Sequence, residues 1–93
     1  MKVEYVELQE GAKNLQKVIE QMRHQNQELY NQVNSLFDTW EGKAKPQYES
    51  DYQRVSHNVD QTLEVADALS QAVFQYAQEI EAVETSHSSS KIQ

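Results

Sequence analysis

The chain has 93 residues, no cysteine, two glycines, one proline and a formal net charge of −7 at pH 7. This length allows one small domain, and with 38% apolar residues the core is thin, so association with another chain is expected. The lack of cysteine excludes disulfides and thiolate metal sites, and the acidic balance argues against nucleic acid or an anionic membrane surface as the main partner.

The N-terminus, Met1-Lys2-Val3-Glu4-Tyr5, carries acid where a secretory signal needs an apolar segment. No apolar run approaches the roughly 20 residues of a membrane span. We therefore expect neither membrane insertion nor a cleaved signal peptide.

The first half of the chain predicts one long helix, over about residues 6–40. Apolar residues recur there at alternating steps of four and three, the spacing of left-handed helix packing. The series is Leu8, Ala12, Leu15, Ile19, Met22, Asn26, Leu29, Val33, Leu36 and Trp40. Asn26, its one polar member, either fixes the register from a buried position or points to water or a bridging side chain.

Residues 40–42 predict a turn. Gly42 suits the left-handed position that follows a helix C-terminus, and Pro46 suits the first turn of the next helix. Because the connection is short, the two helices must be antiparallel neighbours in a hairpin.

The second half predicts another helix, over about residues 44–84, with the same spacing. Its series is Tyr48, Tyr52, Val55, Val59, Thr62, Ala66, Leu69, Val73, Tyr76, Ile80 and Val83. The Ser-rich segment 85–93 lacks this pattern, so we expect it to be disordered.

More apolar residues lie beside both series and widen the apolar stripe. They are Val18, Tyr30, Phe37, Leu63, Val65, Ala72 and Ala77. A stripe this wide predicts an all-α fold in which antiparallel two-helix hairpins pair into a four-helix bundle dimer. The main residues expected at the hairpin or dimer interface are Leu15, Ile19, Met22, Leu29, Val33, Leu36, Tyr52, Val59, Leu63, Leu69 and Val73.

The chain offers little for catalysis or metal binding. His24, His57 and His87 include no pair at the helical metal spacing, and the one Glu-x-x-His, Glu84 to His87, lies at the expected end of the helix. There is no phosphate loop and no nucleophile elbow. We expect no enzyme activity, no catalytic residues, no metal and no cofactor.

The second helix is acidic near its end. A span without Lys or Arg contains Asp60, Glu64, Asp67, Glu79, Glu81 and Glu84. These carboxylates form either a solvated face or a handle for a basic partner surface. Phe74 falls opposite the apolar series, which suggests a contact point for a partner.

The segment Trp40-Glu41-Gly42, at the bend of an acidic hairpin, resembles the motif of the WXG-motif (ESAT-like) family, small proteins exported by bacterial type VII secretion systems. The context adds specificity, because Tyr48 supplies an aromatic residue eight positions after Trp40 and the segment 3–8 leads into the first helix. The resemblance covers residues 3 to about 84. Trp40 and Gly42 either simply build the turn or also contribute to export.

This resemblance implies a non-catalytic protein that folds in the bacterial cytoplasm and is secreted without a cleaved signal peptide. It implies a dimer with itself or with a paired family member, as an export substrate or co-secretion partner, and an FtsK/SpoIIIE-like secretion ATPase as a further partner. Whether the dimer is a homodimer or a heterodimer stays open.

Family members usually carry a second motif, a tyrosine followed four residues later by an acid. Here Tyr76 is followed by Ile80 at that spacing, with Glu79 and Glu81 on either side. The C-terminal export signal, Tyr76, Glu79 and Glu81, is therefore degenerate, and Tyr76 is alternatively a plain core residue. A cytoplasmic coiled-coil adaptor or chaperone for a helical client is the alternative function.

Overall fold

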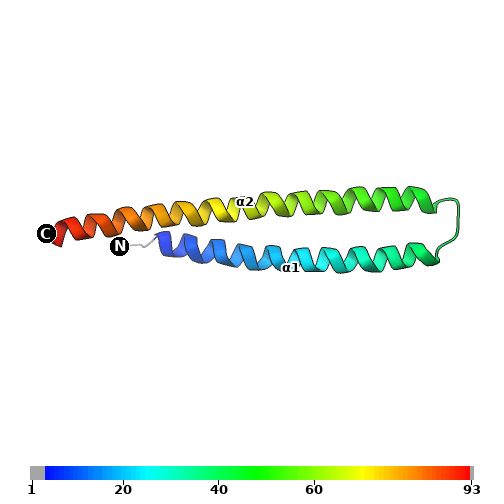
Figure 1. Cartoon of the computed structure of the whole chain (residues 1–93), viewed down its shortest axis with the longest axis horizontal. Helices are drawn as coiled ribbons and strands as arrows, with labels where there is room; N and C mark the ends of the chain where they lie inside the picture. The colour runs from blue at the N-terminus through cyan, green and yellow to red at the C-terminus, as the bar shows by residue number, and fades with distance from the viewer. Residues whose placement is uncertain (1–3, 93) are drawn as a thin grey trace.

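The computed structural model consists of two helices joined by a short turn. It describes the backbone of residues 4–92 and the side chains of residues 4–86. Helix α1 spans Glu4–Thr39 and helix α2 spans Lys45–Ile92. The helices run antiparallel, with both chain termini at the same end (Figure 1). The predicted all-helical architecture is confirmed, and the arrangement of the two helices is consistent with the predicted hairpin.

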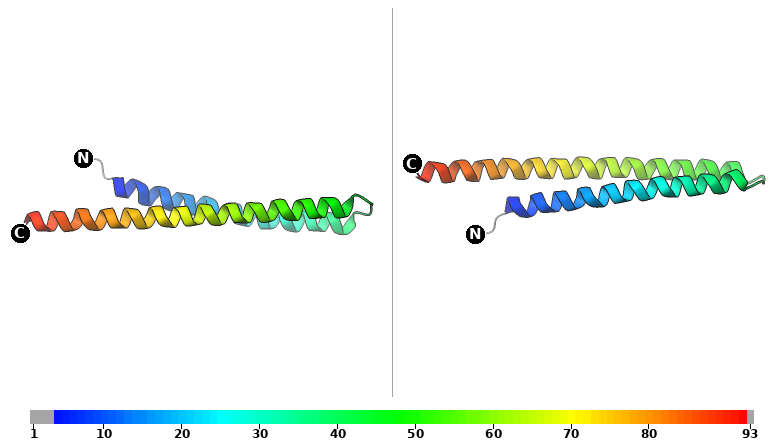
Figure 2. Two further views of the ribbon diagram at one scale, coloured as in Figure 1. Left: turned by 90° about the horizontal axis from the view of Figure 1, so that it is seen from above. Right: turned by 60° about the horizontal axis from the view of Figure 1, so that its bottom comes forward.

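The molecule is a rod. Its principal extents are 77 × 16 × 16 Å and its Cα radius of gyration is 21.5 Å, whereas a compact fold of this length has a radius of about 12 Å. The helices stay in contact along the rod and cross at a shallow angle (Figure 2). Each helix can therefore bury only one side against the other, and the remaining sides face outward.

The predicted disorder of the Ser-rich segment is wrong for residues 85–92, because α2 continues through Ile92. The sequence contains neither Gly nor Pro after Pro46, so nothing breaks the backbone ladder. Extending an existing helix adds one hydrogen bond per residue and needs no new nucleus. Gln93 lies outside the described residues.

The bend also corrects a prediction about Gly42. Neither Gly11 nor Gly42 has a positive φ, so the predicted left-handed conformation is wrong. The chain reverses instead through a turn in which the Lys45 amide donates to the Gly42 carbonyl at 3.3 Å. A Cβ at Gly42 would lie only 3.2 Å from the indole Nε1 of Trp40, so this glycine provides room for the tryptophan ring.

The interior of the hairpin is rotated from the predicted one. Ala12 and Ile19 are buried as expected, but Met22, Leu29 and Leu36 are exposed. The buried residues of the described side chains are Ala12, Ile19, Phe37, Ser56, Leu63, Ser70 and Ala77. Four of these residues, Ser56, Leu63, Ser70 and Ala77, lie on α2 at intervals of seven residues. This row runs beside the predicted apolar series.

The physical reason is helix proximity. Two helices approach closely along rows of small side chains, and Ser56, Ser70 and Ala77 provide such a row on α2. The bulkier rows cannot occupy the same narrow space, so they lie to one side of it. Apolar character alone ranked the bulky rows first, which is why the sequence pattern selected them.

Alanine substitutions at the two glycines should differ in their effect on stability. At Gly11, inside α1, an added Cβ meets nothing within 4 Å, so Gly11→Ala is expected to stabilise the chain by about 0.5–1 kcal/mol through helix propensity. At Gly42 the added methyl must push the Trp40 ring, so Gly42→Ala should bring no gain and should shift the emission of this single tryptophan. Urea unfolding followed by far-UV circular dichroism and fluorescence measures both effects. An equal increase in stability at the two positions would show that Gly42 is not needed to make room for the Trp40 ring.

Candidate functional site

An aromatic cluster surrounds the tryptophan at the bend. The Trp40 ring stacks on Phe37, with centroids 6.0 Å apart and planes at 13°, and it lies 5.5 Å from Tyr48 across the turn. Phe37 comes from the last turn of α1 and Tyr48 from the first turn of α2, so the two helix ends hold the indole between them. Trp40 remains partly exposed, which leaves its outer side available for contact.

A shallow apolar depression continues from this cluster. Its volume is about 480 Å³, and its lining includes Leu36, Trp40, Tyr48, Tyr52 and Val55. At this end of the rod, Leu36 of α1 and Tyr48 and Val55 of α2 line the same depression, and the seven-residue spacing continues each row along its helix from there. We call this side the apolar face. Its two rows are Leu8, Leu15, Met22, Leu29 and Leu36 on α1, and Tyr48, Val55, Thr62, Leu69, Tyr76 and Val83 on α2.

Polar side chains, in contrast, join the helices at several points along the rod between the termini and the bend. Gln9 Nε2 donates to Glu81 Oε2 at 2.6 Å. Asn26 Nδ2 donates to Asp60 Oδ1 at 2.9 Å, which is the bridging alternative left open for this residue. These bonds fix how far one helix is shifted along the other.

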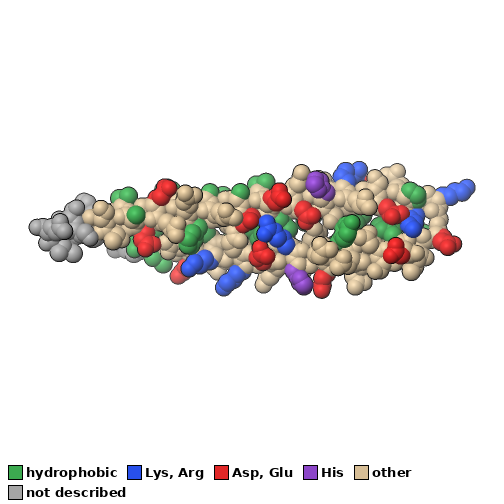
Figure 3. All heavy atoms as spheres, in the orientation of Figure 1, with side chains coloured by type: hydrophobic (Ala, Val, Ile, Leu, Met, Phe, Trp, Pro, Cys, Tyr) green, Lys and Arg blue, Asp and Glu red, His purple; other side chains and the backbone are tan. Residues whose placement is uncertain are grey.

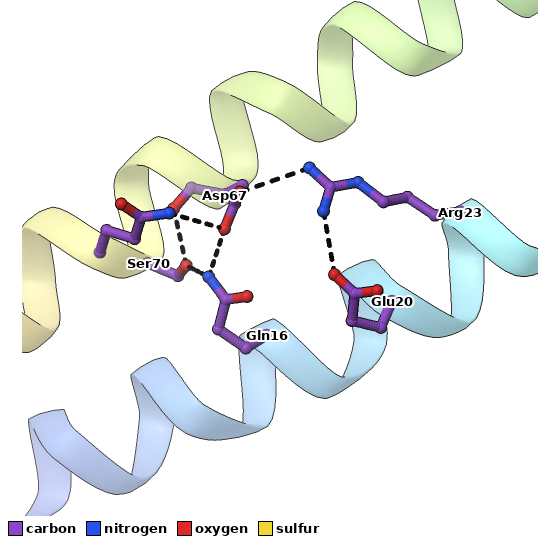
Figure 4. Close-up of polar contacts among 6 residues, drawn as sticks. Gln16, Glu20, Arg23, Asp67 and Ser70 are labelled. Carbon is purple, nitrogen blue, oxygen red and sulfur yellow. Dashed lines mark hydrogen bonds and ion pairs between the residues drawn. The ribbon is translucent and has the colours of Figure 1, made fainter.

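Asp67 is the centre of this polar network (Figure 4). Gln16 Nε2 donates to both the Asp67 carboxylate and Ser70 Oγ, while Gln71 Nε2 donates to the carboxylate at 3.3 Å. Arg23, which also pairs with Glu20, bonds Asp67 Oδ2 at 3.3 Å. Hydrogen bonds from Gln16 and Gln71, followed by the Arg23 guanidinium, hold the pKa of Asp67 below its usual value of 3.8.

This lowered pKa has a consequence in acid. A carboxyl with a depressed folded-state pKa stabilises the fold above its unfolded-state pKa, and this stabilisation is lost as the pH falls through the folded value. We expect Asp67→Asn to lose stability relative to the wild type at pH 6, and this difference to shrink below about pH 3.8. Thermal unfolding at a series of pH values tests this. Glu64→Gln removes the charge of an exposed carboxylate one turn earlier on α2 and is the control. Its difference in stability from the wild type should not follow the same pH profile.

The residues of the expected C-terminal signal lie far from the bend. Tyr76 and Glu79 are exposed, while Glu81 is half-buried and accepts the bond from Gln9. Along α2, Tyr76 is about 45 Å from Pro46 at 1.5 Å per residue. The hairpin therefore separates the two motifs, and one chain cannot bring them together.

The sequence placed Phe74 opposite the apolar series, and because the interior of the hairpin is rotated away from that series, Phe74 is only half-exposed. Its side chain lines a cavity of about 560 Å³ between the helices, which Gln16 and Ser70 also line. The Lys13 ammonium lies 5.9 Å from the centroid of the Phe74 ring. The cation–π contact and the neighbouring helix account for an aromatic residue at this position. Its role as a partner contact stays a prediction.

The other predicted interface residues divide between the interior and the apolar face. Ile19 and Leu63 are buried, and Met22, Leu29, Leu36 and Leu69 are exposed. The half-buried ones are Leu15, Val33, Tyr52, Val59 and Val73. Sequence reasoning missed Ser56 and Ser70, which are the buried polar residues among the described side chains, although their seven-residue spacing with Leu63 and Ala77 was a signal that could have found them.

Charged side chains are spread along the rod. One face of the rod shows charged side chains of both signs scattered over both helices, with small apolar areas between them (Figure 3). The cavities lined by polar side chains lie between the helices, beside Lys13 and Phe74 and beside Gln53 and His57.

Within the described residues, no group of three His, Cys, Asp or Glu side chains is arranged to hold a metal ion. The side chain of His87 lies outside the described part of the chain. Over the same described range, neither helix has an apolar segment long enough to cross a membrane.

Comparison with known proteins gives one match. The sequence model of a family described as WXG100, proteins of 100 residues with WXG, matches residues 1–85. No curated protein and no solved structure shows a significant match. The matched range contains all of α1, the bend with Trp40 and Gly42, and most of α2.

Proposed function

Because the chain belongs to the WXG100 family, whose members are small helical substrates of type VII secretion and not enzymes, we propose that a bacterial type VII secretion system exports it. It acts as a folded, non-catalytic export substrate or co-secretion partner, and it works as a dimer with itself or with a paired family member. The observation that carries this proposal is the bend, where Phe37 and Tyr48 hold Trp40 partly exposed and Gly42 leaves room for its ring.

The export signal is composite. Trp40 and Gly42 lie at the bend, and Tyr76, Glu79 and Glu81 lie about 45–53 Å away along the same rod. Two hairpins packed in opposite directions bring the bend of one next to the C-terminal part of α2 of the other. An FtsK/SpoIIIE-like secretion ATPase then recognises residues from both chains as one patch.

The apolar face supports a dimeric form. Exposed Leu36 on α1 lies on the same side as exposed Tyr48 and Val55 on α2, and Met22, Leu29 and Leu69, which follow at seven-residue spacing, are exposed as well. A continuous apolar surface of this kind on a small protein marks an interaction site. Two hairpins joined through it form a four-helix bundle, in which each helix buries a second side.

Export from living cells tests the proposal. The chain is produced in a bacterium with a type VII system, and the supernatant is compared with that of a strain lacking the secretion ATPase. We expect export only with the ATPase, and we expect Trp40→Ala and Tyr76→Ala to abolish it. Tyr76 is exposed, so its replacement leaves the hairpin interior intact; Asp38→Ala, also exposed and close to the bend, is the matched control. Export of both variants at the wild-type level would contradict the composite signal.

A cytoplasmic adaptor for a helical client is the second candidate. The observation in its favour is the same apolar face, which would also accept a helix of another protein. Retention of the chain in the cytosol of a strain with an active ATPase, together with a stable intracellular complex, would favour this function over export.

A further inference from the structure

We propose that the polar cavity between the middle parts of α1 and α2 binds an arginine side chain from a basic segment of a partner protein. The cavity has a volume of about 460 Å³, and its lining includes Tyr30, Ser56, His57 and Asp60. None of its lining residues belongs to the two rows of the apolar face. The proposal goes beyond the proposed function, because it concerns a second surface and a partner of different chemistry.

The carboxylate of Asp60 gives the cavity a negative charge that no cation of this chain balances. Its Oδ1 accepts a hydrogen bond from Asn26 Nδ2 at 2.9 Å, and this donor is a neutral amide. Arg23 also lines the cavity, but its guanidinium is already bound to Glu20 at 2.9 Å and to Asp67 at 3.3 Å (Figure 4). Since no Lys or Arg of the described residues pairs with Asp60, a cation from outside is the complementary ligand.

The buried hydroxyl of Ser56 is a second group that awaits a partner. Ser56 is 7% exposed and lines the cavity, and its hydroxyl makes no hydrogen bond to any described residue. Ser70, which is equally part of the interior, instead donates to the Asp67 carbonyl and accepts a bond from Gln16. Because buried polar groups in folded proteins are nearly always hydrogen-bonded, a ligand that carries N–H donors gains by reaching Ser56.

The remaining lining favours a guanidinium over an ammonium. The half-buried ring of Tyr30 is supported by Tyr52, with centroids 6.2 Å apart, and a planar guanidinium stacks on such a ring. Gln27 donates through its Nε2 to another residue of α1, which leaves its side-chain oxygen as an acceptor. A guanidinium presents five N–H donors in one plane, so it can bond Asp60, Ser56 and Gln27 together.

The surface beside the cavity extends the site from one side chain to a segment. Glu64 lies one turn after Asp60 on the same side of α2, is exposed, and forms no ion pair within the described part of the chain. A segment that inserts an arginine into the cavity can therefore place a second basic residue against Glu64. Free arginine would lack this second contact.

Fluorescence anisotropy with labelled peptides tests the proposal on the whole chain. The probe is an alanine-rich helical peptide with two arginines four residues apart, and the matched peptides carry lysine or citrulline at both positions. We expect the arginine peptide to bind about fivefold more tightly than the lysine peptide, and the citrulline peptide not to bind. Equal binding of the arginine and lysine peptides would overturn the guanidinium site. Free arginine that competes as well as the peptide would overturn the partner segment.

Isosteric variants then locate the binding site. Asp60→Asn removes the charge but keeps an acceptor for Asn26, and it should weaken binding of the arginine peptide about tenfold. Ser56→Ala should weaken it about threefold. Glu10→Gln, an exposed position on α1 outside the cavity lining, changes the net charge as Asp60→Asn does and is the matched control.

Far-UV circular dichroism of each variant checks that the hairpin remains folded. Equal effects of Asp60→Asn and Glu10→Gln would mean that the peptide follows the net charge of the chain, and they would overturn the site. Peptide binding needs no secretion system, so its absence would leave the proposed function standing. A chain that binds the peptide but is never exported would contradict that function alone.

Discussion

Replacing Phe37 with alanine is expected to lower the free energy of unfolding by about 3–5 kcal/mol. Phe37 is only 7% exposed, and its ring supports the indole of Trp40, so its removal leaves a cavity and loosens the bend. Unfolding in urea, followed by far-UV circular dichroism, measures the loss. The fluorescence of Trp40 should change in the same variant, because its stacking partner is gone.

The neighbouring Asp38→Ala is the control for this prediction. Asp38 is exposed at the C-terminal end of α1, where a negative charge is unfavourable, so its removal should change stability by less than about 0.5 kcal/mol. If Phe37→Ala and Asp38→Ala behaved alike, Phe37 would not belong to the interior of the hairpin.

Ile19 lies in the other half of the rod, and Ile19→Ala is expected to lower the free energy of unfolding by about 2–5 kcal/mol. Ile19 is 1% exposed and lies in the part of the hairpin where polar bonds join the helices, so few other apolar side chains can compensate for its loss. Thermal unfolding should show a lower midpoint and less helix at 37 °C. The midpoint should fall by the same amount at every protein concentration relative to the wild type, because the lost contact lies within one chain.

Ile19→Val provides the graded comparison. It removes one methyl group, for which a loss of about 0.5–1.5 kcal/mol is expected. An unchanged midpoint in Ile19→Ala would mean that the two helices do not pack through this residue.

The helical hairpin itself was predictable from sequence. Breakers occur only at Gly11, Gly42 and Pro46, and the apolar spacing continues through both halves, so the two helices and their connection follow from local rules. Tyr48, singled out for its distance from Trp40 in the sequence, does lie beside the indole. Such features depend on neighbours along the chain.

Which side of each helix packs against the other helix was not predictable in the same way. Met22 is 45% exposed and Leu36 is 62% exposed, although both are more apolar than the buried serines. Apolar spacing reveals that a helix has rows to bury, but it does not distinguish the row buried within one chain from the row left for another. That distinction depends on side-chain size and on cross-helix bonds such as Gln16 to Asp67, which appear only when both helices are placed together.

The order of contacts along the rod also determines how the chain can fold. The aromatic contact between Trp40 and Tyr48 closes a loop of only a few residues, whereas the cross-helix bonds span 34 residues at Asn26 and 72 at Gln9. Closing a short loop costs less entropy than closing a long one, and each bond formed shortens the loop that the next one must close. Folding should thus nucleate at the bend and proceed toward the termini, so that the tryptophan reports the earliest step and the last contact to form is the first to open.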